Sequence, residues 1–110
     1  MGRALRFWTE ALGYQLRDTD DPDDDFLVLV PREGSGPQLS LMESTTPVQA
    51  RPRVHLDLYA GDAADQRAEV ERLIALGANR VDWDSYPADA DFVVLADPEG
   101  NLFCVIDTSG

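Results

Sequence analysis

The only histidine of the chain lies in a segment whose polar residues recur at every second position. Four polar side chains share this alternation: Arg53, His55, Asp57 and Tyr59. A period of two is typical of a β-strand, so these side chains are expected on one face. There His55 could bind a metal ion or carry a proton near neutral pH, and a nearby aspartate could fix its tautomer. A histidine that is simply hydrogen-bonded within a polar strand face is the alternative.

The single cysteine, Cys104, has two interpretations. It could be a soft metal ligand opposite His55, or a small apolar side chain of the core. Leu102 and Ile106 share its face, and the chain has no lysine and no second histidine to lower the thiol pKa. We therefore expect Cys104 to be buried. One cysteine also precludes an internal disulfide, which is typical of proteins in a reducing cytoplasm.

Two other polar segments indicate structure rather than chemistry. Six aspartates fall within residues 18–25, without the glycine and final glutamate of a calcium-binding loop, so a solvated loop is expected. Residues 97–101 contain Pro98 and Gly100, which predict a hairpin turn, and their acidic side chains would repel a phosphate. The sequence contains no serine nucleophile motif.

Hydrophobic periodicity predicts the elements that position these residues in the first half. Apolar residues at helical spacing predict a helix over 3–12, and Gly13 is suited to end it in the left-handed conformation. Three strands are expected after this helix: 14–17, 26–30 and 38–42. Residues 45–52 contain two prolines and no apolar period, which predicts a linker.

The second half begins with the alternating segment 53–59, which predicts a strand. A helix is expected over 63–76, because Asp62 is a good N-cap and apolar residues follow at helical spacing. Three further strands are expected: 79–83, 91–96 and 102–106.

A fixed offset of 64 residues relates the two halves. Leu12 and Gly13 correspond to Leu76 and Gly77, and the order of helix and three strands is the same. The strand 53–59 has no counterpart before Met1, so either the start codon lies upstream or the first half is one strand short. A missing strand leaves a bare sheet edge, which favours pairing with a second chain. We therefore expect a homodimer.

Composition limits the classes of partner. The 110 residues carry 21 acidic and nine basic side chains, for a formal charge of −12. This charge argues against nucleic acid and against an anionic membrane surface. The sequence has no apolar run of about 18 residues that could span a membrane, and its N-terminus does not resemble a secretory signal. A cytoplasmic location is therefore predicted.

Three motifs resemble the vicinal oxygen chelate superfamily, which includes glyoxalase I, bleomycin-resistance proteins and extradiol dioxygenases. Residues 6–14 resemble the FW…LGY helix of that superfamily. Residues 53–58 and 96–105 resemble its small actinobacterial glyoxalase-like members. The resemblance implies an α+β fold of two βαβββ modules curled around a cup that binds ligands or metal. It also implies one domain over 1–110, with module one at 1–44, a linker at 45–52 and module two at 53–110.

The resemblance also implies where side chains face. The inner face of the cup is expected to carry Gln38, Ser40, Met42, His55, Asp57, Tyr59, Leu102, Cys104 and Ile106. The outer face, under the helices, is expected to carry Val54, Leu56, Leu58, Phe103 and Val105. Three aromatic residues near strand ends could line the mouth of the cup: Trp83, Tyr86 and Phe92.

The metal positions of the family, carried over by position, fall on Ser40, His55 and Cys104, and a fourth position is absent from the chain. The family usually has a glutamate where this chain has Cys104. One conventional ligand out of four predicts that no cofactor is resident, with a divalent metal bound through His55 as the alternative.

The sequence therefore favours a protein that binds a small organic molecule without a complete divalent-metal site. The expected ligand-binding residues are Gln38, Ser40, Arg53, His55, Asp57, Tyr59 and Cys104. A metal-dependent lyase or dioxygenase of the glyoxalase type, completed by an upstream strand or a second subunit, is the first alternative. A protein-interaction module with no small ligand is the second. Whether the protein is an enzyme stays open at this point.

Overall fold

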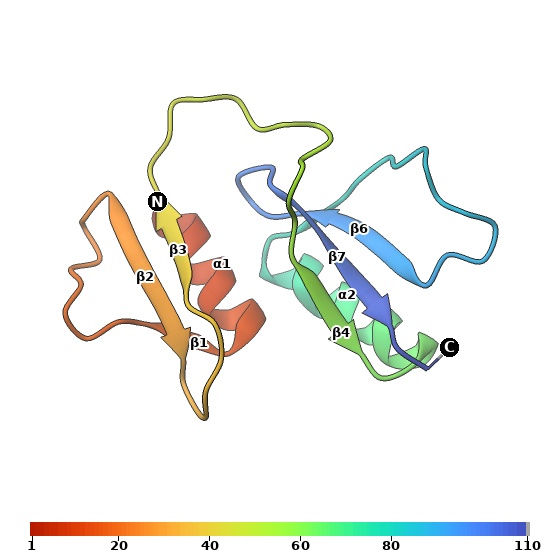
Figure 1. Cartoon of the computed structure of the whole chain (residues 1–110), viewed down its shortest axis with the longest axis horizontal. Helices are drawn as coiled ribbons and strands as arrows, with labels where there is room; N and C mark the ends of the chain where they lie inside the picture. The colour runs from red at the N-terminus through yellow and green to blue at the C-terminus, as the bar shows by residue number, and fades with distance from the viewer. Residues whose placement is uncertain (110) are drawn as a thin grey trace. The chain divides into compact units, whose positions relative to one another are not determined.

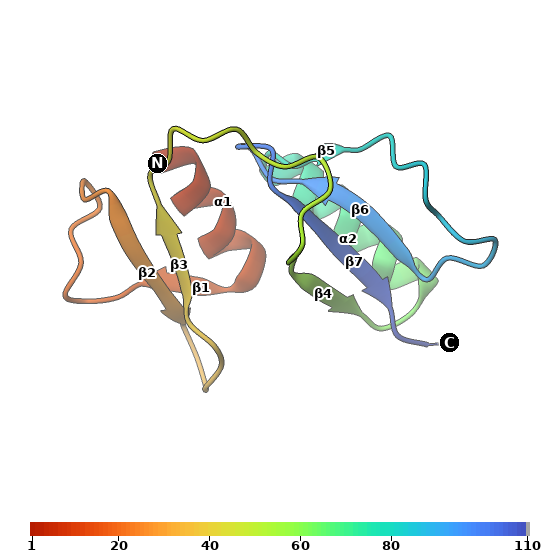
Figure 2. The ribbon, with the colours of Figure 1, turned by 45° about the horizontal axis from the view of Figure 1, so that its top comes forward.

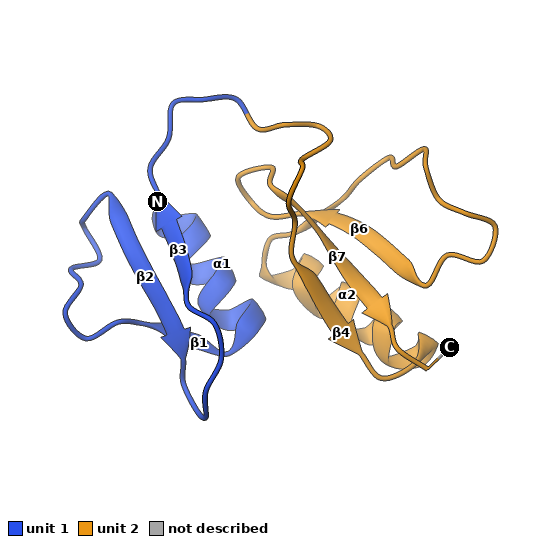
Figure 3. Ribbon diagram, in the orientation of Figure 1, with its two compact units in different colours: residues 1–47 blue, residues 48–110 orange. Residues whose placement is uncertain are grey.

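The computed structural model describes residues 1–109 and divides into two compact units, residues 1–47 and 48–110 (Figure 3). Each unit contains one helix and its own β-sheet within the described residues. Neither helix in residues 1–109 combines the length and the hydropathy that crossing a bilayer would require. The two units are described here one at a time.

Unit 1 has the order helix, strand, strand, strand (Figure 1). Its elements are α1 (Gly2–Leu12), β1 (Tyr14–Leu16), β2 (Phe26–Pro31) and β3 (Leu39–Met42). The sheet order is β1-β2-β3, and both strand pairs are antiparallel.

The ends of α1 and the centre of β2 follow from residue type. Helix α1 ends where Gly13 adopts a left-handed conformation with φ 68°, and its N–H donates to the Thr9 carbonyl. Only glycine adopts this conformation without a steric cost from its side chain. The continuous apolar run of β2 is buried at Leu27 and Leu29, both fully excluded from solvent.

Unit 2 adds a strand before its helix. Its elements are β4 (Asp57–Ala60), α2 (Ala63–Leu76), β5 (Asn79–Arg80), β6 (Phe92–Ala96) and β7 (Leu102–Asp107). The sheet order is β4-β7-β6-β5, with β4 and β7 parallel and the other pairs antiparallel. Helix α2 lies along one face of this mixed sheet (Figures 1 and 2).

The helix–sheet contact of unit 2 is held by both apolar and polar groups. Val70 and Leu73 of α2 are buried, as are Phe103 and Val105 of β7. The Gln66 side-chain amide donates to the Val105 carbonyl at 3.0 Å. The prediction that Phe103 and Val105 lie on the covered face of the sheet is consistent with this burial. At the start of α2 the Asp62 carboxylate accepts from the Asp65 N–H at 2.8 Å, which confirms the predicted N-cap.

The predicted architecture is confirmed as α+β. Unit 2 has the order βαβββ, whereas unit 1 has αβββ and, within the described residues, no strand equivalent to β4. The parallel pairing of β4 with β7 is the feature that the βαβββ order requires, because α2 connects two parts of one sheet.

Two predicted strands are shorter in the structure. Strand β4 begins at Asp57 and not at position 53, and Val54 is 86% exposed. The prediction that Val54 and Leu56 lie under a helix is therefore wrong, since Leu56 is also exposed. Strand β5 ends at Arg80 and not at position 83.

The predicted turn at 97–101 is present and is organised by one carboxylate. Asp97 is only 2% exposed and accepts from the Glu99 N–H at 2.9 Å and from the Asn101 N–H at 2.8 Å. Gly100 takes a φ of 91°, which favours glycine. This turn sets the start of β7, the central strand of the candidate site.

Candidate functional site

Three chemically active side chains of unit 2 come together where β4 and β7 pair. His55 Nε2 lies 3.2 Å from Asp57 Oδ1. Together with the Cys104 sulfur, the ligand atoms of these residues all lie within 4.8 Å of one another. We call His55, Asp57 and Cys104 the unit 2 cluster.

The backbone of the sheet explains this meeting. Asp57 and Cys104 are register partners in the parallel β4–β7 pair, and the Cys104 N–H donates to the Leu56 carbonyl at 2.9 Å. Side chains of residues two apart on an extended chain share a face, so His55 lies on the same side as Asp57. The alternation in the sequence predicts that His55 and Asp57 share a face. The meeting of Asp57 with Cys104 depends on the register between β4 and β7.

The three residues of the cluster differ in how far they are exposed to solvent, and the thiol of Cys104 has a raised pKa. The side chains of His55 and Asp57 are each 43% exposed, while Cys104 is buried, as predicted. Burial, and to a smaller extent the negative charge of Asp57, raises the pKa of the Cys104 thiol to about 11. The thiol is therefore protonated at neutral pH unless a cation replaces its proton.

A hollow of about 180 Å³ adjoins the cluster. His55 and Cys104 line it together with aromatic and aliphatic side chains, among them Trp83, Phe92 and Val94. A small apolar hollow with one polar edge is the usual form of a ligand site.

Several contacts fix the loop between β5 and β6, which carries the aromatic residues beside the hollow. The Arg51 guanidinium lies 4.8 Å from the Trp83 ring centroid and also forms an ion pair with Asp84. The Tyr86 and Phe92 rings are 5.2 Å apart. Beside them, the Val94 N–H donates to the Tyr86 hydroxyl at 2.8 Å. These contacts hold Trp83 and Phe92 beside the hollow. That the two aromatic residues line a binding site stays a prediction.

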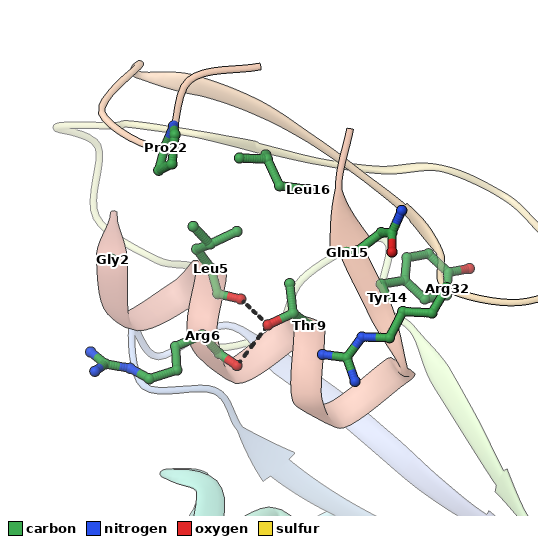
Figure 4. Close-up of a pocket in the computed structure, with 9 residues that line it drawn as sticks. All are labelled: Gly2, Leu5, Arg6, Thr9, Tyr14, Gln15, Leu16, Pro22 and Arg32. Atoms are coloured by element: carbon green, nitrogen blue, oxygen red, sulfur yellow. Dashed lines mark hydrogen bonds between the residues drawn. The ribbon is translucent and has the colours of Figure 1, made fainter. Parts of the chain in front are cut away.

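Unit 1 has a larger hollow, of about 570 Å³, between α1 and β1 (Figure 4). Two of its polar side chains, Thr9 and Arg32, are engaged in other contacts. The Thr9 hydroxyl turns back onto its own helix and donates to the Leu5 carbonyl at 2.9 Å. Arg32 forms an ion pair with Glu10 at 3.1 Å. We therefore place the candidate site in unit 2.

The remaining predicted site residues are not members of the cluster. Tyr59 shares the β4 face with Asp57 and is 74% exposed. Arg53 is exposed and precedes β4. Gln38 and Ser40 are exposed residues of unit 1, before and within β3. That Gln38, Ser40, Arg53 and Tyr59 contact the ligand stays a prediction.

Sequence reasoning assigned Asp57 to ligand binding and did not foresee it as a metal donor. The signal was present, because Asp57 follows His55 by two residues on a strand. What was missing was the neighbouring strand, which brings a thiol to the same carboxylate.

The cluster can be tested for its fit to a divalent ion. Metal–ligand distances of about 2.0–2.3 Å place neighbouring donors of a tetrahedral site roughly 3.3–3.8 Å apart. The 3.2 Å contact of His55 with Asp57 is close to that spacing, and the 4.8 Å limit for Cys104 requires a small rotamer change. Imidazole, carboxylate and thiol donors therefore fit a borderline-soft ion, bound by three ligands.

A βαβββ unit with a site on the open face of its mixed sheet defines a class of α+β proteins. Within that class, the chain belongs to the glyoxalase-like domain family, whose model matches residues 1–106. This confirms the predicted membership in the vicinal oxygen chelate superfamily. No curated protein matches the sequence significantly.

Solved structures show the same fold. A glyoxalase/bleomycin resistance protein/dioxygenase family enzyme from Burkholderia phytofirmans PsJN is 17% identical, with a TM-score of 0.67, over 94% of this chain and 87% of that chain. A glyoxalase-related enzyme from Fulvimarina pelagi is 16% identical, with a TM-score of 0.67, over 96% of this chain and 78% of that chain. The fosfomycin resistance protein FosX from Mesorhizobium loti is 16% identical, with a TM-score of 0.63, over 100% of this chain and 82% of that chain.

Proposed function

We propose that the protein binds a small organic molecule in the unit 2 hollow, as a binding protein of the glyoxalase/bleomycin-resistance type. The observation that supports this proposal is the hollow of about 180 Å³ with an aromatic wall and His55 at its edge. Pockets for small molecules are mostly apolar and contain a few polar groups that set orientation.

The size and lining of the hollow limit the ligand. Sites for drug-sized molecules occupy about 300–1,000 Å³, so this hollow accepts a smaller molecule or one group of a larger molecule. Trp83 and Phe92 favour a flat group, because aromatic faces stack on planar systems. His55 then provides the directional contact at the polar edge.

Asp57 orients the histidine for this contact. His55 Nε2 faces Asp57 Oδ1 across 3.2 Å, so Nδ1 is the ring nitrogen left to contact a ligand. A ligand with a hydroxyl or an N–H at one end of a flat group matches this arrangement.

Tryptophan fluorescence tests the proposal directly. The variant Trp8→Phe leaves Trp83 as the only indole, because the chain has two tryptophans. This variant is titrated, after removal of metal with a chelator, with fosfomycin, bleomycin and a panel of small flat hydroxy-aromatic compounds. We expect saturable quenching by at least one compound, and about tenfold weaker binding in Phe92→Ala, since aromatic contacts contribute about 0.5–1.5 kcal/mol.

The same titration has a clear negative outcome. If no compound gives saturable quenching, or if Phe92→Ala binds as tightly as Trp8→Phe alone, the hollow is not a ligand site. The protein-interaction module then becomes the better hypothesis. The variant Tyr59→Phe is the matched control, because Tyr59 is exposed and does not line the hollow.

A metal-dependent lyase or dioxygenase of the glyoxalase type is the second candidate. The specific observation in its favour is the unit 2 cluster, which offers three donor atoms within 4.8 Å. A divalent ion there would act as a Lewis acid that polarises vicinal oxygens of a substrate. In that function His55, Asp57 and Cys104 hold the ion, and Trp83 and Phe92 exclude water beside it. A site completed by an upstream strand or a second subunit belongs to this candidate.

A further inference from the structure

We propose that Arg51 closes the unit 2 hollow by joining the two irregular segments that line it, and that release of Arg51 opens the hollow to small molecules. The linker segment is residues 48–56, which precede β4, and the loop segment is residues 81–91, which connect β5 and β6. Closure by Arg51 does not depend on what the hollow binds, whereas a role in ligand entry rests on the proposed function. Arg51 is thus a positioning residue, which acts on the hollow through the residues that it holds.

Both segments contribute side chains to the lining of the hollow. Pro52 and His55 come from the linker segment, and Trp83 and Ser85 come from the loop segment. The rest of the lining belongs to β6 and β7, which are paired in the sheet. The distance between the two irregular segments is therefore the dimension of the hollow that can change without breaking a strand pair.

The Arg51 guanidinium contacts the loop segment at three neighbouring side chains. It forms an ion pair with the Asp84 carboxylate, donates to the Ser85 hydroxyl at 3.1 Å and lies 4.8 Å from the Trp83 ring centroid. The Ser85 hydroxyl also donates to the Asp84 carboxylate at 3.0 Å. We call Arg51 and these three contacts the Arg51 clasp.

The clasp is the polar connection between the two segments. Within residues 1–109, the hydrogen bonds of residues 48–54 to other parts of the chain all come from Arg51. Over the same described range, residues 82–85 hydrogen-bond outside their loop to Arg51 alone. Tyr86 is fixed separately, because its hydroxyl accepts from the Val94 N–H. Release of Arg51 therefore frees one part of the loop segment and leaves the part beside Tyr86 in place.

The clasp is exposed, so it can open at little cost. The side chains of Arg51 and Asp84 are 58% and 75% exposed. Exposed ion pairs and exposed cation–π contacts contribute little to stability, and salt screens the ion pair. The pKa of Asp84 is lowered, chiefly by the hydrogen bond from Arg51, so this carboxylate is charged at neutral pH. Ionic strength is therefore the variable that acts on the clasp.

The competing interpretation is that Arg51 and Asp84 form an ordinary surface ion pair and that the hollow keeps its width without them. Many exposed ion pairs have no measurable effect. Helix α2 provides a pair for comparison, Arg72 with Glu69, whose side chains are also partly exposed. The two interpretations differ in whether loss of the Arg51 ion pair makes Trp83 more accessible.

Acrylamide quenching of Trp83 fluorescence tests the clasp without a ligand. The full chain with Trp8→Phe is the parent protein, because Trp83 is then the only indole. Acrylamide is neutral, so the charge of −12 does not alter its approach. We expect the quenching constant to rise about 1.5-fold from about 0.01 M to about 1 M NaCl, since the Debye length falls from about 30 Å to about 3 Å.

Variants assign this effect to the clasp. Asp84→Asn removes one charge and leaves Arg51 and Trp83 in place, so we expect about twofold stronger quenching at low salt and little salt dependence. Arg51→Gln should behave in the same way. Arg51→Lys should keep part of the salt dependence, because lysine retains the charge but not the planar fork. Glu69→Gln is the matched control and should be quenched as the parent is.

Cleavage by trypsin after Arg53 reports on the linker segment. Arg53 is exposed, and trypsin does not cleave the bond between Arg51 and Pro52. We expect Asp84→Asn to be cleaved after Arg53 about threefold faster than the parent, because local opening gives the protease access to the backbone. Glu69→Gln should be cleaved at the parent rate, and mass spectrometry identifies the fragments.

Two results would overturn the proposal. The first is an equal quenching constant in Asp84→Asn, Arg51→Gln and the parent, with matching circular dichroism. The second is a salt dependence that both variants retain in full. Neither measurement contains an organic ligand, so failure here leaves the organic-ligand proposal standing. If the clasp opens as expected but the fluorescence titration finds no ligand, closure by Arg51 stands and its role in ligand entry falls with the proposed function.

Discussion

The thiol of Cys104 is the side chain whose ionisation is most altered by its surroundings. Burial is the main cause, and the carboxylate of Asp57 adds to it, so the pKa rises from 9.0 to about 11. An unfolded chain exposes this thiol to water and returns it to its ordinary pKa. The folded state therefore keeps a proton that the unfolded state loses between these two values.

This difference predicts an alkaline loss of stability. As pH rises from about 9 to about 11, the unfolded state binds fewer protons than the folded state, so the free energy of unfolding falls. We expect the parent to lose on the order of 1–2 kcal/mol more than Cys104→Ala across this window. Urea denaturation of both proteins at several pH values measures the difference. Parallel stability curves for the two proteins would contradict the prediction.

The buried carboxylate of Asp97 has a structural role that the sequence only hinted at. It accepts from two backbone N–H groups and from the Asn101 side-chain amide at 3.1 Å. Its position at 2% exposure would be costly without these bonds. The turn that starts β7 therefore depends on one residue.

Removing this carboxylate should weaken the fold. Hydrogen bonds to charged groups contribute about 1.5–3 kcal/mol each and are not additive, so we expect Asp97→Ala to lower the free energy of unfolding by roughly 2–4 kcal/mol. Asp89→Asn, at an exposed loop position, should change it by less than about 0.5 kcal/mol. Chemical denaturation compares the two, and equal effects would show that the turn is not held by Asp97.

At the scale of elements, register explains why β4 is shorter than its sequence pattern. The pairing of Asp57 with Cys104 places Val54 opposite Asn101, which belongs to the turn before β7. A strand cannot extend the ladder beyond its partner, so residues 53 and 54 lie outside the sheet although the alternation continues through them in the sequence. The local alternation predicts which side chains share a face of β4. The position at which β4 begins depends on its register with β7, which the local pattern does not contain.

Strand β5 is short for a different reason. Arg80 pairs with Leu95, so Val81 would be next opposite Val94. The Val94 N–H instead donates to the hydroxyl of Tyr86, at 2.8 Å. The Tyr86 side chain thus replaces a backbone partner for β6 beyond Arg80. The periodicity of residues 79–83 carries no information about this contact. Helix α2, in contrast, runs over Ala63–Leu76 as predicted, because Asp62 and Gly77 are local signals.

The Tyr86 contact gives a prediction for this edge of the sheet. Tyr86→Phe keeps the ring against Phe92 and removes the hydroxyl, leaving the Val94 N–H without this acceptor. We expect a loss of about 1 kcal/mol in stability and faster hydrogen exchange at the Val94 amide. Tyr59→Phe, at an exposed tyrosine, should leave that exchange rate unchanged. An unaltered Val94 rate in Tyr86→Phe would exclude the Tyr86 hydroxyl as its protecting acceptor.

For the whole molecule, the internal repeat was the most informative part of the sequence. The offset of 64 residues predicted two helix-plus-strand units, and the two sheets of three and four strands confirm that pattern. The candidate site was only partly predictable. His55 and Cys104 could be named from their positions, but the meeting of Cys104 with Asp57 needed the parallel β4–β7 pair. Contributions of Gln38 and Ser40 to this site, and the division into one domain of two modules, stay predictions.

The open edge of unit 1 gives the last prediction. In unit 2, β7 has a parallel neighbour, β4, whereas within residues 1–109 the equivalent strand β3 pairs with β2 alone. Met42 on β3 is 68% exposed, and Phe26, its register partner on β2, is 49% exposed. An uncharged strand with a free edge and exposed apolar side chains favours pairing with another chain, so we expect a homodimer formed along β3.

A charge on this edge should oppose the pairing. We expect Met42→Lys to weaken dimerisation about tenfold or more, because natural edge strands avoid pairing by carrying lysine. Met42→Leu keeps the apolar character and should dimerise as the parent does. Sedimentation equilibrium over a range of concentrations measures both dissociation constants. A parent that stays monomeric at every concentration, or a Met42→Lys variant that dimerises as well as Met42→Leu, would place the association elsewhere or remove it.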